Sequence, residues 1–187
     1  MASNHNNPLC SAAIVHFGRY WKTTTIRSLP SFIPHDVSFF LCVYLYFCSL
    51  CPGLNNVIRD ITKTLFQLYG IGGNVYGIQG GYKGFYDPEL PPLSLTPGLV
   101  ENIHHEGGTV LGSSRGGFDL DKIIAFLKER RISQLYIIGG DGTHRGAFKI
   151  HEGCMEAGLN VAVAGIPKTI DNDVDYIDKV CVTCRTW

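Results

Sequence analysis

A glycine-rich turn, Gly139-Gly140-Asp141-Gly142-Thr143, holds the first residues whose types and spacing could do chemistry. It follows an apolar run and precedes a helical pattern. Glycines let backbone N–H groups approach phosphate oxygens closely, and the start of a helix adds partial positive charge. A carboxylate in such a turn can hold Mg²⁺ directly or through water. The turn predicts a magnesium and phosphate site; the alternative is a plain connection between a strand and a helix.

A second polar segment, Pro167-Lys168-Thr169-Ile170-Asp171-Asn172-Asp173, follows the next apolar run. In extended backbone, Asp171 and Asp173 lie on the same side. One carboxylate could accept a proton from a substrate hydroxyl while the other orients the substrate or helps to hold a metal. Lys168 could neutralise a phosphate. The alternative is an Asx-type turn with solvated charges.

Arg115 stands among serines and glycines in the loop 112–117, so its guanidinium is uncrowded and suited to phosphate. The alternative is a solvated loop arginine. His151 and Cys154 would share a helix face, but we expect no metal site there. Phosphate-binding glycines, a carboxylate for magnesium, two basic residues and a proton acceptor together make up the machinery of phosphoryl transfer.

Short apolar strands alternate with amphipathic helices in the part of the chain that carries these motifs. Strands are predicted at 74–78, 109–111, 135–138 and 161–164. Helices are predicted at 54–68, at 96–105, after a cap at Asp119, and from Thr143 to Gly158. This alternation indicates an α/β fold, a doubly wound parallel sheet with helices on both faces. Its ligands bind beyond the carboxyl ends of the strands, so the loops 112–117, 139–143 and 167–173 should meet at one edge.

Composition excludes several other classes of protein. The chain has 187 residues, of which 45% are hydrophobic, and 16 basic residues balance 16 acidic ones. The hydrophobic content is therefore sufficient for an apolar core, and the net charge of zero gives no indication of nucleic-acid binding. The seven cysteines are scattered, which favours reduced thiols and a cytoplasmic location. The apolar stretch 37–51 is shorter than the roughly 20 residues of a membrane span, so we do not expect membrane attachment.

Five ordered segments resemble the phosphofructokinase family, and its plant-type ATP-dependent 6-phosphofructokinases most of all. They lie at 51–55, 77–85, 107–117, 138–143 and 167–173. NAD kinases and diacylglycerol-type lipid kinases share the glycine-rich turn but do not fit the last segment. The resemblance covers about residues 50–180. It implies the Rossmann-like N-terminal lobe of a phosphofructokinase, here incomplete, and the magnesium-dependent transfer of phosphate from ATP to fructose 6-phosphate in glycolysis.

The resemblance also implies the sugar-binding residues. Asp171 would be the base that takes the proton from the 1-hydroxyl of the sugar. The residues that would line the sugar-phosphate side are Lys168, Thr169, Ile170, Asp171 and Asp173.

On the nucleotide side, the resemblance implies that Asp141 binds Mg²⁺. The residues that would cradle ATP or touch its phosphates are Arg115, Gly116, Gly140, Asp141, Gly142 and Thr143. Pyrophosphate-using members typically carry Asp where this chain has Gly142, so Gly142 favours ATP. Lys168 occurs in pyrophosphate users and in plant-type ATP users. A pyrophosphate-dependent phosphofructokinase and a non-catalytic fragment that binds nucleotide or full-length subunits remain as alternatives.

The resemblance divides the chain into three parts. Residues 1–51 are expected to be irregular and outside the family pattern, 52–180 to form the partial nucleotide lobe, and 181–187 to be a tail outside the pattern. Ala12–Val15 resembles the strand that should precede the first loop, and Ser49 replaces a family glycine there. We expect an impaired fragment that lacks most of the contacts of a homo-oligomer, in the cytoplasm or in a plastid.

Overall fold

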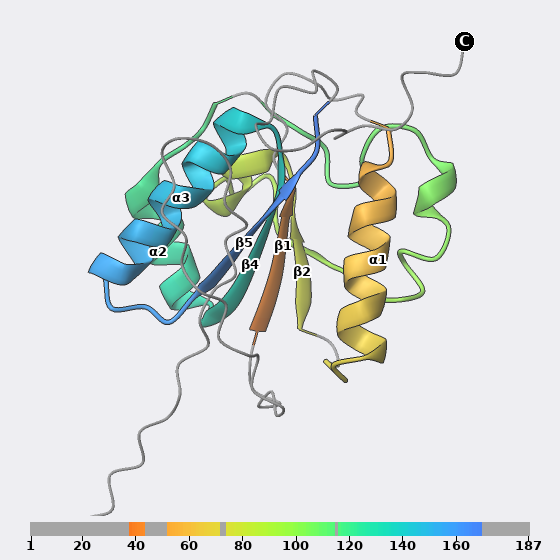
Figure 1. Cartoon of the computed structure of the whole chain (residues 1–187), viewed down its shortest axis with the longest axis horizontal. Coiled ribbons are helices and arrows are strands. Elements are labelled where there is room, and N and C mark those ends of the chain that lie inside the picture. Colours follow the sequence, from red (N-terminus) through yellow and green to blue (C-terminus); the bar gives the residue numbers. More distant parts are fainter. Residues whose placement is uncertain (1–37, 44–51, 72–73, 115, 170–187) are drawn as a thin grey trace, which may run out of the picture.

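The computed structural model describes residues 38–43, 52–71, 74–114 and 116–169 (Figure 1). These residues contain a five-stranded sheet of order β3-β2-β1-β4-β5. The strands are β1 (Ser38–Val43), β2 (Val75–Ile78), β3 (Leu93–Ser94), β4 (Ile132–Gly139) and β5 (Ala162–Pro167). All neighbours are parallel except β2 and β3, which are antiparallel.

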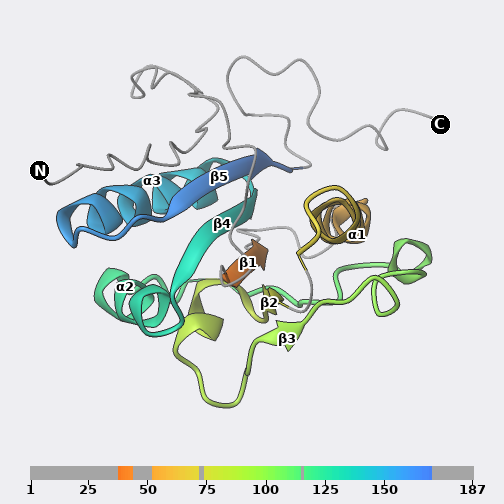
Figure 2. The same ribbon diagram turned by 90° about the horizontal axis from the view of Figure 1, so that it is seen from below.

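Helices cover both faces of the sheet. Helix α1 (Leu54–Gln67) lies on one face, and α2 (Leu120–Glu129) and α3 (Asp141–Glu156) lie on the other (Figure 2). Two short 3-10 helices, Gly81–Phe85 and Ile103–His105, lie in the connections. The predicted α/β fold with helices on both faces is confirmed. No described helix is long and apolar enough to cross a membrane.

The apolar run in the second half of β4, from Leu135 to Ile138, is buried on both faces of the sheet. Successive residues of a strand face opposite sides. Ile137 packs in the core beneath α2 and α3, whereas Ile138 packs in the core beneath α1. Both side chains are fully buried. A strand covered on both faces cannot place a polar side chain on either one without burying it.

Helices α1, α2 and α3 begin and end close to their predicted positions. Leu54, Ile58 and Leu65 form the buried stripe of α1. The carboxylate of Asp119 caps α2 by accepting the Lys122 N–H at 3.3 Å, as predicted. A helix capped in this way has one of its otherwise unpaired N–H groups satisfied.

The predictions for 96–105 and 109–111 were wrong. The first segment forms turns and the short helix Ile103–His105, and the second forms a turn. The buried side chain of Asn55 explains the difference. Its Nδ2 donates to the carbonyls of Ile103 (2.9 Å) and Glu106 (3.3 Å), and its Oδ1 accepts from Val110 N–H (2.9 Å). These bonds from a side chain of α1 hold the segment in its turns, in which the Ile103 carbonyl also accepts the Glu106 N–H at 3.1 Å.

The segment 1–51, expected to be irregular, contains the central strand of the sheet. Strand β1 lies between β2 and β4, where Leu41 pairs with Gly77 on one side and Tyr136 on the other. A strand inside a sheet covered on both faces needs an apolar sequence, which Phe39–Val43 supplies. The predicted strand Ala12–Val15 and the residue Ser49 lie outside the described residues.

Candidate active site

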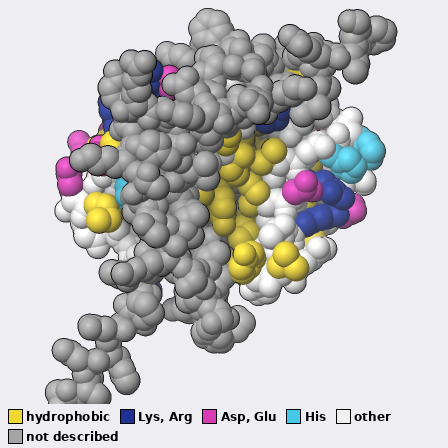
Figure 3. All heavy atoms as spheres, in the orientation of Figure 1, with side chains coloured by type: hydrophobic (Ala, Val, Ile, Leu, Met, Phe, Trp, Pro, Cys, Tyr) yellow, Lys and Arg dark blue, Asp and Glu magenta, His cyan; other side chains and the backbone are white. Residues whose placement is uncertain are grey.

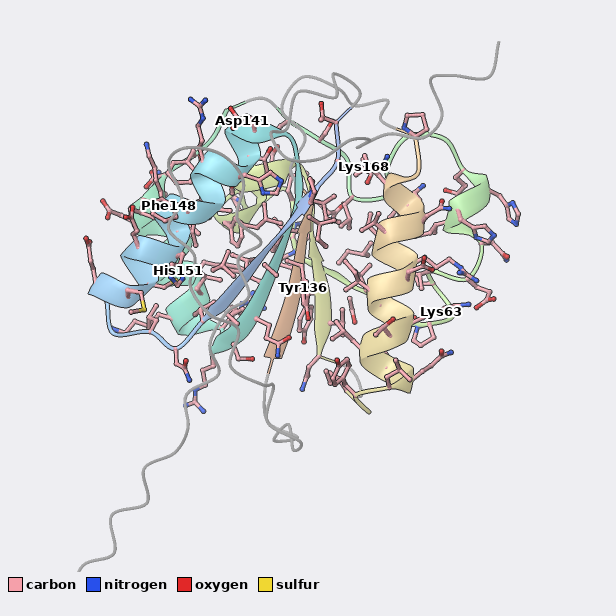
Figure 4. All side chains as sticks on the ribbon, viewed as in Figure 1. Lys63, Tyr136, Asp141, Phe148, His151 and Lys168 are labelled. Carbon is pink, nitrogen blue, oxygen red and sulfur yellow. The ribbon has the colours of Figure 1, made fainter. Side chains whose placement is uncertain are left out.

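Strands β4 and β5 end side by side, and the two polar segments leave the sheet there. The Lys168 N–H donates to the Gly139 carbonyl at 2.8 Å. A Cβ atom on Gly140 would lie 3.6 Å from the Cβ of Thr169. Figure 4 shows Asp141 and Lys168 at the same end of the molecule. The prediction that these two segments meet at the carboxyl edge of the sheet is confirmed for their described residues.

The glycine-rich turn begins α3 without a side-chain cap. Gly140 is the N-cap residue in extended conformation, and no side chain bonds to the first turn from that position. The first bond of the helix runs from His144 N–H to the Gly140 carbonyl, at 3.1 Å. The start of this 16-residue helix therefore presents backbone N–H groups and partial positive charge to the edge of the sheet. That arrangement suits a phosphate.

Asp141 lies at this helix start, with its side chain half exposed. One carboxylate oxygen forms an ion pair with Arg145 Nη2 at 2.8 Å, one helical turn away. The described residues contain no group of three His, Cys, Asp or Glu side chains able to hold a metal. Mg²⁺ is commonly held by one or two carboxylates together with phosphate oxygens. The half-exposed carboxylate of Asp141 beside the glycine-rich turn fits that kind of site.

Lys168 reaches from β5 toward the start of α1. A Cβ atom on Gly53 would lie 3.7 Å from Lys168 Cε and 3.8 Å from Nζ. Gly53 is the N-cap of α1, with a φ of 86° that favours glycine, and neither a side-chain cap nor an acidic residue lies in the first turn. The starts of α1 and α3 both lack side-chain caps, and both lie beside the segment that carries the Lys168 ammonium group. The result is a concentration of positive charge at the carboxyl end of the sheet.

The buried side chain of Tyr82 contacts the glycine-rich turn from inside the domain. Its ring is almost fully buried, and its hydroxyl donates to the Thr143 carbonyl at 2.9 Å. A Cβ atom on Gly146 would lie 2.5 Å from that hydroxyl, so α3 can approach Tyr82 only because residue 146 is glycine. In the sequence, Tyr82 is one residue of the family-like segment 77–85, and no role was predicted for it. The spacing of the motif does not reveal a contact with a helix about 60 residues later.

His144 is a second residue that the sequence analysis missed. Its ring is buried beneath the turn, with Nε2 3.0 Å from the Gly139 carbonyl. Burial lowers the pKa of this imidazole below its ordinary value, despite the opposing effects of the Gly139 carbonyl and Asp141. In the sequence, His144 is a polar residue near the start of a helix, and its position next to the glycine-rich turn was the available signal.

The remaining predicted residues divide into two groups. Gly116 belongs to the loop 112–117, which packs on the 3-10 helix Gly81–Phe85 through a hydrogen bond from Tyr86 to the Gly117 carbonyl at 3.0 Å. The same short helix contains Tyr82, which donates a hydrogen bond to the glycine-rich turn, so the loop 112–117 and the turn both contact one element. The predicted site residues that lie outside the described part of the chain are Arg115, Ile170, Asp171 and Asp173.

Fold and site together define an α/β domain whose sheet edge carries two helix starts without side-chain caps and a lysine, an arrangement suited to phosphate. The chain belongs to the phosphofructokinase family, since the family model of that description matches residues 43–183. The matched region begins at the last residue of β1 and extends into the segment predicted as a tail.

The chain is similar to named ATP-dependent enzymes. ATP-dependent 6-phosphofructokinase 4, chloroplastic, of Arabidopsis thaliana is 55% identical over 131 residues, which are 70% of this chain and 24% of that protein. ATP-dependent 6-phosphofructokinase 7 of the same plant is 52% identical, with coverages of 70% and 26%. The ATP-dependent 6-phosphofructokinase of Borreliella burgdorferi is 44% identical, with coverages of 70% and 29%. The chain thus spans about a quarter of the length of these relatives.

Solved structures share the fold. A pyrophosphate-dependent phosphofructokinase from Marinobacter aquaeolei superposes with a TM-score of 0.64 at 22% identity, covering 73% of this chain and 34% of that one. Pichia pastoris phosphofructokinase in the T-state superposes with a TM-score of 0.66 at 20% identity, covering 79% and 16%. At these identities the likeness concerns the fold alone.

Proposed function

We propose that this chain is the nucleotide lobe of an ATP-dependent 6-phosphofructokinase, which transfers the terminal phosphate of ATP to the 1-hydroxyl of fructose 6-phosphate. One observation carries the proposal: two helix starts without side-chain caps and the segment of Lys168 meet where β4 and β5 end. The names of the similar plant and bacterial proteins support the choice of reaction.

On the nucleotide side, the backbone from Gly140 to Thr143 would hold the ATP phosphates against the start of α3. Asp141 would hold Mg²⁺, which when bound offsets negative charge on the phosphate oxygens. The Lys168 ammonium, above the start of α1, would attract the transferring phosphate. Arg115 and Gly116 would contact the phosphates from the loop 112–117.

On the sugar side, the segment after β5 would supply the acceptor chemistry. Thr169 is buried beside the turn at Gly140, which supports a place near both substrates. Asp171 would accept the proton of the sugar hydroxyl as phosphate is transferred, with Ile170 and Asp173 lining the same side. The rest of a phosphofructokinase would complete the sugar site and the contacts of a homo-oligomer.

Gly142 supports ATP rather than pyrophosphate as the donor. It is exposed near the start of α3, where an Asp side chain would add negative charge and bulk in the path of a nucleotide. Lys168 is the observation that favours pyrophosphate as a second candidate, since a compact diphosphate needs a strong cationic partner. A chain that binds nucleotide without turnover is the third candidate.

We further infer the boundaries and the location. Residues 52–180 would form the lobe with β1 as an added strand, and 181–187 a tail of which the family match covers part. The interleaved acidic and basic side chains seen near α1 in Figure 3 favour small-molecule ligands over nucleic acid or a membrane surface. The scattered cysteines favour the cytoplasm, and the chloroplastic relatives keep a plastid location as the alternative.

Calorimetry of magnesium–ATP binding to the full chain tests the proposal. Asp141→Ala removes the proposed magnesium carboxylate and should weaken binding at least about tenfold. Asp121→Ala is the matched control, because Asp121 occupies the first turn of α2 instead. Tighter binding of magnesium–pyrophosphate than of magnesium–ATP would favour the second candidate. Equal binding by the Asp141→Ala and unchanged chains would contradict the proposed site.

A further inference from the structure

The imidazole of His144 fills the space between α3 and the sheet directly behind the glycine-rich turn. The residue is 7% exposed, and its Nε2 lies 3.0 Å from the carbonyl oxygen of Gly139. Gly139 is the last residue of β4, immediately before the turn. The side chain of a residue in the first turn of α3 therefore bonds back to the strand that leads into it.

The Gly139 carbonyl joins the two halves of the proposed site. It also accepts the Lys168 N–H at 2.8 Å, and Lys168 begins the segment that leaves β5. One oxygen thus fixes the end of β4, the start of α3 and the start of the sugar-binding segment. A displacement of this carbonyl would change the position of the turn relative to Lys168.

The His144 ring packs against Gly165 of β5, where the absence of a side chain leaves space for it. A Cβ atom on Gly165 would lie 2.6 Å from His144 Nδ1 and 2.9 Å from Cε1. Real Cβ atoms do not approach a ring so closely, so any side chain on residue 165 would push the imidazole out. The φ of Gly165 lies outside the left-handed region, so its own backbone conformation is compatible with alanine.

We propose that His144 is a positioning residue for phosphate binding: its Nε2–H bond to the Gly139 carbonyl holds the turn Gly140–Thr143 in register with Lys168. The inference rests on the proposed function of that turn. It goes beyond packing, because a methionine would fill a similar volume and could not donate a hydrogen bond. Burial, which lowers the pKa of the imidazole, keeps the neutral form with a single N–H available for this bond.

Two substitutions of His144 separate hydrogen bonding from packing. His144→Gln retains an N–H donor at about the position of Nε2, whereas His144→Met retains volume alone. Affinity for magnesium–ATP should remain within about twofold in His144→Gln and fall about tenfold in His144→Met. Cys154→Ala, a buried change on the same helix, is the control for general destabilisation. Equal affinities of the Gln and Met variants would overturn the proposal.

A second test perturbs the ring without changing it. Gly165→Ala should weaken magnesium–ATP binding about tenfold in the unchanged chain and should have little further effect in a His144→Ala background. Such non-additivity is expected only if Gly165 acts through the imidazole. Independent, additive effects of the two substitutions would contradict the role of His144.

Amide exchange provides a measurement that needs no nucleotide. The Lys168 N–H, which shares the Gly139 carbonyl, should exchange about tenfold faster in His144→Met than in His144→Gln at equal global stability. If the unchanged chain does not bind magnesium–ATP, the proposed function fails. The exchange rates still decide whether His144 holds this carbonyl, and equal rates in the two variants would overturn the inference.

Discussion

Replacement of Lys168 by methionine should weaken magnesium–ATP binding without lowering the free energy of unfolding of the ligand-free protein. In the ligand-free protein, the Lys168 ammonium lies close to the start of α1, 3.8 Å from the position of a Gly53 Cβ. A helix start carries about half a positive charge, and a cation beside it costs roughly 0.3–1 kcal/mol. The first turn of α1 holds no acidic residue, and no ion pair of Lys168 is found among the described residues.

Lys168→Met should therefore leave the free energy of unfolding unchanged or raise it by about 0.5 kcal/mol. A charge-assisted bond to phosphate would be lost at the same time, so affinity for magnesium–ATP should fall at least about tenfold. Urea unfolding of the ligand-free chain and calorimetry of magnesium–ATP binding measure the two quantities.

Lys63→Met is the control, because the Lys63 ammonium on the outer side of α1 pairs with the Glu101 carboxylate at 2.7 Å. That variant should lose up to about 1 kcal/mol of stability and no affinity. A ligand-binding role would be disproved if Lys168→Met destabilised the ligand-free chain by more than 1 kcal/mol while magnesium–ATP bound as before. Lys168 would then be a structural residue.

Three further substitutions test individual contacts. Asn55→Ala should lower the free energy of unfolding by about 1–3 kcal/mol in urea titrations, because the Ile103 and Glu106 carbonyls and the Val110 N–H each lose a hydrogen bond to the Asn55 amide. A loss under 1 kcal/mol would contradict this. Tyr82→Phe should cost about 1 kcal/mol in thermal unfolding through the lost bond to Thr143, and no change would show that the bond adds nothing. Burial lowers the pKa of His144 below its ordinary value of 6.5, so the folded state binds fewer protons than the unfolded state and the free energy of unfolding should decrease as the pH falls below 6.5. His144→Gln should remove this decrease between pH 7 and 5. The same pH profile in both proteins would disprove the contribution of His144.

The parts of the fold that the sequence predicted well are those controlled by local signals. Helix α2 has both a capping residue, Asp119, and a buried stripe that includes Ile123 and Leu127. The second half of strand β4 is an apolar run, Leu135–Ile138, that ends in glycines. Parallel connections of this kind bring its end beside that of β5. Gly140 and Thr169 lie side by side because each follows the end of one of these two parallel strands.

The parts that failed depend on partners far along the chain. Thr96 and Pro97 resemble the start of a helix, but Asn55 of α1 satisfies the backbone at Ile103 and Glu106 and removes the advantage of helical bonds. Strand β3 has two residues, too few for any periodicity. These outcomes are set by tertiary contacts, which the local pattern does not contain.

The supporting residues of the site were missed for a related reason. Tyr82 and His144 act through buried hydrogen bonds to the carbonyls of Thr143 and Gly139. Residues that bind a ligand have side-chain chemistry that is visible in a motif. Residues that support a backbone carbonyl are recognisable only when the fold shows which carbonyl lies beside them.

The central claim is that ATP phosphates bind to the turn at the start of α3. The most direct measurement is the change in backbone amide chemical shifts of the isotope-labelled full chain when magnesium–ATP is added. The largest shifts should occur at Gly140, Asp141, Gly142, Thr143 and Lys168, with none at the start of α2. Binding that shifts amides elsewhere and leaves the turn unchanged would contradict it.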